Sequence, residues 1–126
     1  MESLNKMTVV VKDNGFGIKN VIIDEPKTYN SLSFKTLNIL IDIFKRLERD
    51  NKTRVIILSG NGKGFSAGHN LKEVKNLKVR SKYLKLFNLC SKLMLNIVEG
   101  RKPVIAKVHG SAFAAGCQLA ASCDLA

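Results

Sequence analysis

Two short apolar runs, each followed by a turn of small residues, constrain the fold of this chain most. Val55–Leu58 is a continuous apolar run, and Pro103–Val108 is a second short, mostly apolar segment. The turns that follow them are Ser59–His69 and Gly110–Gly116. Continuous apolar runs rich in β-branched residues are typical of strands buried on both faces of a parallel sheet. Parallel neighbours need a crossover connection, usually a helix. The pattern therefore predicts βαβ units, in which ligands collect at the carboxyl ends of the strands.

The N-terminal part of the sequence predicts a β-hairpin. Thr8–Lys12 and Asn20–Asp24 are apolar, β-branched runs that flank Asp13–Gly17. This connection contains an Asn-Gly pair, which is a strong hairpin signal. An antiparallel pair is therefore expected ahead of the parallel strands.

Two amphipathic helices are expected between the strands. Ser33 suits the N-cap of the first helix, which is expected to end near Asp50. Its apolar face is predicted by five residues at helical spacing: Leu37, Leu40, Ile41, Phe44 and Leu47. The second helix ends at Gly100, and its apolar face is expected to contain Tyr83, Phe87, Cys90, Leu93, Met94 and Ile97. The order of elements predicts an α/β fold with a mostly parallel sheet and flanking helices.

Composition places the chain among globular intracellular proteins. The 126 residues are 45% hydrophobic and 25% charged, which suits one domain with a core. No apolar run reaches the ~18 residues of a membrane span, and Met1–Lys6 lacks the apolar core of a secretory signal. The three cysteines are odd in number and form no CxxC pair. We expect reduced, buried thiols, with no disulfide and no metal site.

The strong positive charge of the chain favours a polyanionic or phosphorylated ligand. Lys and Arg number 21 against 10 Asp and Glu, a net charge of +11. Lysine dominates over arginine, and the aromatic residues do not interleave with the basic ones. No RNA- or DNA-binding motif is present. Nucleic acid is therefore not the expected partner, although a basic RNA-binding module stays open as an alternative.

The two small-residue turns suit a site that binds an oxygen atom with backbone amides. Small side chains let the backbone approach a ligand, and the start of a helix presents free N–H groups. Two such turns facing each other can offer two donors to one oxygen, which is the arrangement of an oxyanion hole. The structural alternative is that the glycines only close loops and pack helices tightly.

Two segments of this chain resemble the signatures of the crotonase (enoyl-CoA hydratase/isomerase) superfamily. These segments are Phe65–Glu73 and Lys102–Asp124. The resemblance implies a crotonase-like ββα spiral that acts on acyl-CoA. Members of the superfamily are considerably longer, so we expect residues 1–126 to be the N-terminal part of a single domain, a fragment without the C-terminal part. The resemblance also implies a homotrimer or a dimer of trimers for the full-length protein, in mitochondria or the cytoplasm.

The resemblance assigns roles to particular atoms. The amides of Ala67 and Ala115 match the oxyanion donors, and Gln118 matches a position that orients water or a carbonyl. Lys63 and Lys72 can pair with phosphates of coenzyme A, which enters as part of the substrate rather than as a separate cofactor. The backbone expected to hold the substrate comprises Ser66, Ala67, Gly68, His69, Asn70 and Leu71.

The sequence departs from the family pattern at the catalytic acid. Gln118 stands where hydratases have their first glutamate, and an amide cannot take up a proton near neutral pH. The second glutamate would lie beyond Ala126. Efficient hydration is therefore not expected. Two possibilities remain: an enzyme that stabilises an enolate, and a non-catalytic acyl-CoA-binding or regulatory homologue.

Several polar residues near the turns have both a catalytic and a structural interpretation. His69 and His109 can act as a base or donor, or simply hold the loops in place. Asn70 replaces the Asp of many members and can cap the following helix in the same way. Ser66 lacks the context of a nucleophile elbow. Asp124 is expected to be a structural hydrogen-bond acceptor.

Overall fold

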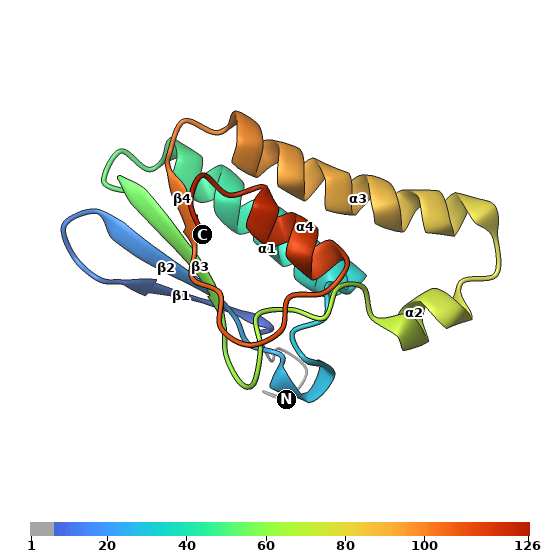
Figure 1. The fold of residues 1–126 in the computed structure, drawn as a ribbon. Coiled ribbons are helices and arrows are strands. Elements are labelled where there is room, and N and C mark those ends of the chain that lie inside the picture. Colours follow the sequence, from blue (N-terminus) through green and yellow to red (C-terminus); the bar gives the residue numbers. More distant parts are fainter. Residues whose placement is uncertain (1–6) are drawn as a thin grey trace.

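A computed structural model describes residues 7–126, and the segment Met1–Lys6 lies outside the described residues. Figure 1 shows a four-stranded sheet with the helices gathered on one side of it. The elements follow in the order β1 Val9–Asp13, β2 Ile18–Ile23, η2 Pro26–Thr28, α1 Phe34–Arg49, β3 Val55–Gly60, α2 Leu71–Asn76, α3 Arg80–Glu99, β4 Val104–Ala106 and α4 Ala115–Ala121. The predicted α/β fold class is confirmed.

The sheet combines one antiparallel pair with two parallel pairs. Its spatial order is β1-β2-β3-β4. β1 and β2 pair antiparallel, with Val9 opposite Ile23, whereas β2–β3 and β3–β4 are parallel. Gly15 in the connecting turn has a φ of 82°, a left-handed conformation that glycine adopts at little cost. The predicted hairpin and the mostly parallel sheet are both confirmed.

The prediction that β3 is buried on both faces is wrong. Burial alternates along the strand, with Ile56 and Leu58 buried and Val55 and Ile57 only half-buried. The helices lie on one side of the sheet (Figure 1), so only one face of β3 is fully covered within the described residues. A continuous apolar run identifies a strand but does not show which neighbours cover each face.

Helix α1 forms as its sequence pattern indicates. The Ser33 hydroxyl accepts a hydrogen bond from the Thr36 amide at 3.2 Å, which caps the first turn. All five apolar residues predicted for the inner face of α1 are buried. They enter the main core together with the inward residues of the strands.

Helix α3 begins at Arg80, and its C-cap is Gly100, the predicted end. Cys90, Leu93 and Ile97 are buried as predicted, but one residue of the buried face differs. Leu86 is fully buried, whereas Phe87 is 44% exposed. The predicted face assigned Phe87 to the core, and that assignment is wrong. Leu86 lies four residues before Cys90 and seven before Leu93, on the same stripe of the helix, whereas Phe87 is ~100° further round.

The three cysteines do not share one environment. Cys90 is buried, Cys123 is half-buried and Cys117 is exposed on α4, so the expectation of buried thiols fails for Cys117. Burial, with the charge of Asp124, raises the pKa of Cys123 to about 11. None of the helices in residues 7–126 is long and apolar enough to cross a membrane. The same residues contain no cluster of His, Cys, Asp and Glu that could hold a metal ion.

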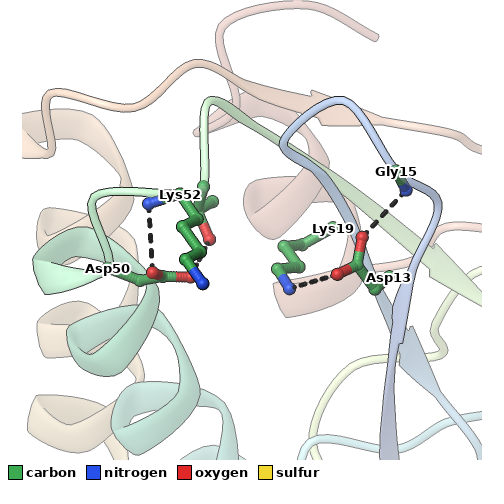
Figure 2. A network of polar contacts seen from close by, with 6 residues as sticks. Asp13, Gly15, Lys19, Asp50 and Lys52 are labelled. Carbon is green, nitrogen blue, oxygen red and sulfur yellow. Dashed lines mark hydrogen bonds and ion pairs between the residues drawn. The ribbon is translucent and has the colours of Figure 1, made fainter.

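A polar network fixes the end of the sheet where the parallel strands begin. Figure 2 shows the Lys19 ammonium and the Gly15 amide both donating to Asp13, at 2.9 and 2.8 Å. These two hydrogen bonds, that of Lys19 first, hold the pKa of Asp13 below its usual range. At the end of α1, Asp50 accepts a hydrogen bond from the Lys52 amide at 3.1 Å. This network lies at the end of the strands opposite the two small-residue turns.

Candidate functional site

Backbone hydrogen bonds join the two small-residue turns. The Ser111 carbonyl accepts from the amides of Phe65 and Ser66, at 2.9 and 3.3 Å. The Ser66 carbonyl in turn accepts from the Phe113 amide at 3.0 Å, and Ser66 forms a parallel bridge with Ala112. The turn after β3 and the turn after β4 are therefore held against each other by main-chain hydrogen bonds.

Two glycines make this close approach possible. A Cβ on Gly110, whose φ is 63°, would stand much closer to the Lys63 carbonyl oxygen than van der Waals contact allows. A Cβ on Gly116 would collide with the Ser66 carbonyl in the same way. Side chains at these positions would therefore push the two turns apart.

The Ala115 amide lies beside the first turn. Its nitrogen is 3.2 Å from the point where a Cβ on Gly68 would stand. Ala115 is the first residue of α4, so its N–H has no partner within the helix. Ala114 precedes it with a φ of 49°, a conformation that is strained for alanine. Strain of this kind is often retained where it directs a functional group.

The first turn offers two amides with different surroundings. The Ala67 N–H, the donor expected from the resemblance, donates to the Tyr29 carbonyl at 2.9 Å. The His69 N–H, on the other side of Gly68, has no hydrogen-bond acceptor among residues 7–126. The Ala115 N–H also has none within this part of the chain.

Two hollows border the first turn. The first has a volume of about 400 Å³ and the second about 300 Å³, and both are lined by Tyr29 and Ala67. Lys63 lines the first, and Lys27 and Lys72 line the second. Lys63 and Lys72 were expected near the ligand, whereas Lys27 and Tyr29 were not. Lys27 lies in η2, and Tyr29 is the C-cap of that short helix.

A buried asparagine holds the first turn in place. Asn30 is fully buried, and its side-chain amide donates to the carbonyls of Asn61 and Gly64, at 2.7 and 3.0 Å. The Ser66 hydroxyl donates to the Asn30 carbonyl at 2.8 Å and accepts from the Gly68 amide at 3.2 Å. Ser66 is therefore engaged in a structural network, in agreement with the absence of a nucleophile elbow.

Asn70 and Leu71 begin the short helix α2 at the mouth of the second hollow. The Asn70 side chain accepts from the Glu73 amide at 3.1 Å, so the predicted cap is confirmed. Glu73 also accepts from the Phe34 amide at 3.0 Å, which ties α2 to the start of α1. Leu71 lines the hollow and is 80% exposed.

The two histidines have different environments. The His69 ring lines the second hollow and meets the Phe87 ring edge-on, with centroids 5.2 Å apart. Its Nδ1 is buried and has no partner among the described residues. The His109 Nε2 lies 2.6 Å from the Gly62 carbonyl oxygen, a contact that joins the two loops. This contact supports the structural interpretation of His109.

Gln118 and Asp124 take up different positions around α4. Gln118 is exposed, one turn beyond Ala115 on the same helix. Its amide side chain supplies no acid at that point. Asp124 accepts a hydrogen bond from the Val104 amide at 2.8 Å, which confirms its structural role at the start of β4.

Comparison with known proteins gives a consistent result. Residues 13–126 match the enoyl-CoA hydratase/isomerase family. The chain is 44% identical over 110 residues to human enoyl-CoA hydratase domain-containing protein 3, mitochondrial, covering 87% of this chain and 36% of that protein. It is 35% identical over 118 residues to mitochondrial enoyl-CoA hydratase of Pongo abelii, and the match covers 90% of this chain and 38% of that protein.

Solved structures show the same relationship. An enoyl-CoA hydratase of Mycobacterium smegmatis superposes with a TM-score of 0.92 at 40% identity, covering 95% of this chain and 47% of that one. Human enoyl-CoA hydratase domain-containing protein 3 superposes with a TM-score of 0.88 at 40% identity, covering 94% of this chain and 46% of that one. The chain thus spans less than half of these relatives. The predicted crotonase-like fold is confirmed, and the chain belongs to the enoyl-CoA hydratase/isomerase family.

Proposed function

We propose that this protein binds acyl-CoA and stabilises negative charge on the thioester oxygen with two backbone amides. The observation that carries the proposal is the position of the Ala115 amide, 3.2 Å from the Cβ site of Gly68. We infer that this amide and the amide of His69, the residue after Gly68, can both donate to one ligand oxygen. Preorganised donors of this kind stabilise a developing oxyanion, and loss of one costs ~100- to 1,000-fold in rate in well-studied enzymes.

The structure favours the His69 amide over the Ala67 amide as the partner of Ala115. The Ala67 N–H already donates to the Tyr29 carbonyl, so it would have to give up that bond to serve an oxyanion. The His69 N–H has no such competitor among residues 7–126. We therefore assign the first donor to His69 and give the Ala67 amide a supporting role in the wall of the two hollows.

The two hollows suit the remainder of a coenzyme A ester. Lys27, Lys63 and Lys72 surround them with positive charge, which favours phosphate groups. Tyr29 and Phe113 add exposed aromatic surface to the lining of the first hollow. A ligand with anionic phosphates at one end and an apolar chain at the other matches this lining.

The proposed chemistry stops short of efficient hydration. Polarisation of the thioester lowers the barrier to forming an enolate, but addition of water also needs a group that transfers protons. Gln118 cannot do this. The same observation favours a second candidate function, a non-catalytic acyl-CoA-binding protein, in which the oxygen is held without turnover.

A carbonyl-labelled thioester separates these two candidates. Butyryl-CoA with ¹³C at the thioester carbon is titrated into the full chain and followed by NMR. A downfield shift of the bound carbonyl, with changes at the His69 and Ala115 amide protons, supports the oxyanion site. Binding without a carbonyl shift supports the non-catalytic candidate, and absence of binding contradicts both.

A second variant tests whether only the acid is missing. Gln118→Glu introduces a carboxylate one turn beyond Ala115 while leaving both donors unchanged. We expect this variant to gain measurable hydration of crotonyl-CoA, with Gln118→Met as the matched control that changes the side chain without adding a charge. Equal activity in both variants would show that a further acid is required. The trimeric assembly implied by the family stays a prediction, which sedimentation of the protein can test.

A further inference from the structure

A groove between α1 and α3 gathers positive charge away from the two small-residue turns. The two helices pack side by side (Figure 1). Near their C-terminal ends they leave a hollow of about 230 Å³, lined by Phe44, Lys45, Glu48, Arg49 and Asn96. The chain then enters β3 and β4 at the ends of these strands opposite the turns.

Two lysines from different helices approach each other at this groove. Lys45 lies on α1, and Lys92 lies on α3 one turn before Asn96. The positive charge of Lys92 is the main cause that lowers the pKa of Lys45, and burial and the charge of Arg49 lower it further. Like charges near each other repel. An anion placed between them would turn this repulsion into two attractive contacts.

No free carboxylate compensates this charge within the groove. Glu48 is the one acidic residue in its lining, and its carboxylate already accepts from the Arg101 amide and from Arg101 Nε, at 3.1 Å each. Outside the lining, Asp42 forms an ion pair with Arg46, at 3.3 Å.

The groove also contains an unused hydrogen-bond donor. The side-chain nitrogen of Asn96 is buried and has no partner among residues 7–126. A buried amide without a partner carries a desolvation cost, which a ligand oxygen would remove. Arg49 adds a planar guanidinium that can bind two oxygens of a phosphate at once.

We propose that Lys45, Arg49, Lys92 and Asn96 form a second anion site, which binds the phosphate group of a small phosphorylated ligand. Two ammonium groups, one guanidinium and one neutral amide supply enough donors for several of the oxygens of a phosphate dianion. The site is separate from the acyl-CoA hollows, because it lies at the opposite end of the parallel strands. Its occupation therefore does not depend on the proposed oxyanion site.

Titration of the full chain with inorganic phosphate tests this site directly. The side-chain amide signals of Asn96 are followed by NMR, and we expect a saturable shift. Lys45→Gln and Lys92→Gln should each weaken binding about tenfold, the loss of one charge-assisted hydrogen bond. Lys75→Gln on the exposed face of α2 is the matched control, because it removes the same charge elsewhere and should change nothing.

A parallel titration with coenzyme A identifies the source of the phosphate. Displacement of inorganic phosphate from Asn96 by coenzyme A would assign the site to a phosphate of that molecule, and no displacement would assign it to a different phosphorylated metabolite. A linear shift without saturation, or equal weakening by Lys75→Gln, would overturn the proposal. So would a short RNA that binds with steep salt dependence while inorganic phosphate leaves Asn96 unchanged.

Discussion

Replacing Gly110 by alanine should separate the two turns that form the site. Gly110 has a φ of 63°, and a Cβ there would press on the Lys63 carbonyl oxygen. The left-handed conformation costs alanine roughly 1–2 kcal/mol, and forcing an atom into a filled space costs roughly 1–3 kcal/mol more. We therefore expect Gly110→Ala to lower the free energy of unfolding by about 2–5 kcal/mol.

Gly15→Ala is a matched control for this substitution. Gly15 has a φ of 82°, but a Cβ there would meet nothing within 4 Å. It should therefore cost only the conformational part, roughly 1–2 kcal/mol. The difference between the two variants measures the contact between the turns. Urea unfolding gives both values, and at an m-value of about 1–2 kcal/mol per M the midpoints should differ by about 1 M.

The outcome also bears on function. If Gly110→Ala moves the second turn, the Ala115 amide moves away from Gly68, and the carbonyl shift of bound butyryl-CoA should shrink together with stability. Gly15→Ala should leave that shift unchanged, because Gly15 lies in the hairpin turn at the other end of the sheet. Equal stability losses in the two variants would refute the close contact between the turns.

Three further results are expected. Ala114→Gly should raise the free energy of unfolding by up to about 1 kcal/mol in urea, because glycine relieves the strain of a φ of 49°. Lys19→Met should return the pKa of Asp13 toward its ordinary value in a carboxyl NMR titration. Because the pKa of Asp13 is lowered in the folded protein, the ionised Asp13 stabilises the fold above the unfolded pKa of about 3.9, and this stabilisation is lost as the pH falls through the pKa of the folded state. The Lys19→Met variant should therefore lose less stability in acid than the original protein. Iodoacetamide should label Cys117 before Cys123 at pH 8, because Cys117 is exposed and the pKa of Cys123 is about 11.

Local sequence patterns predicted the elements well, because the interactions that define them are short in range. The Ser33 cap and the Gly100 stop depend on neighbours within one helical turn. The hairpin depends on the few residues around Gly15. Leu86 and Phe87 are both at helical spacing from Cys90, four and three residues before it, so spacing alone could not show which of them is buried against the rest of the fold.

The candidate site was predicted in outline but not in its hydrogen bonds. The pairing of the two turns is expected from their small residues and from the family pattern, whereas the role of the Ala115 amide stays a prediction. The partner of the Ala67 amide is Tyr29, on a segment far away in sequence, so no local pattern could reveal it. The burial of Asn30 was missed for the same reason, since its partners Asn61 and Gly64 come from the loop after β3.

The hydrogen bonds between Ser66, Ser111 and Phe113 join main-chain atoms only. Their geometry survives almost any change of side chain that leaves room for the backbone. An alanine scan of this chain would therefore pass over the groups proposed to hold the substrate oxygen, because alanine carries the same amide as the residue it replaces. Only proline, or an ester in place of the peptide bond, removes the donor itself. Under the proposed function, sequence divergence within the two turns can alter the acyl group that is accepted while the main-chain donors proposed to polarise the thioester stay the same.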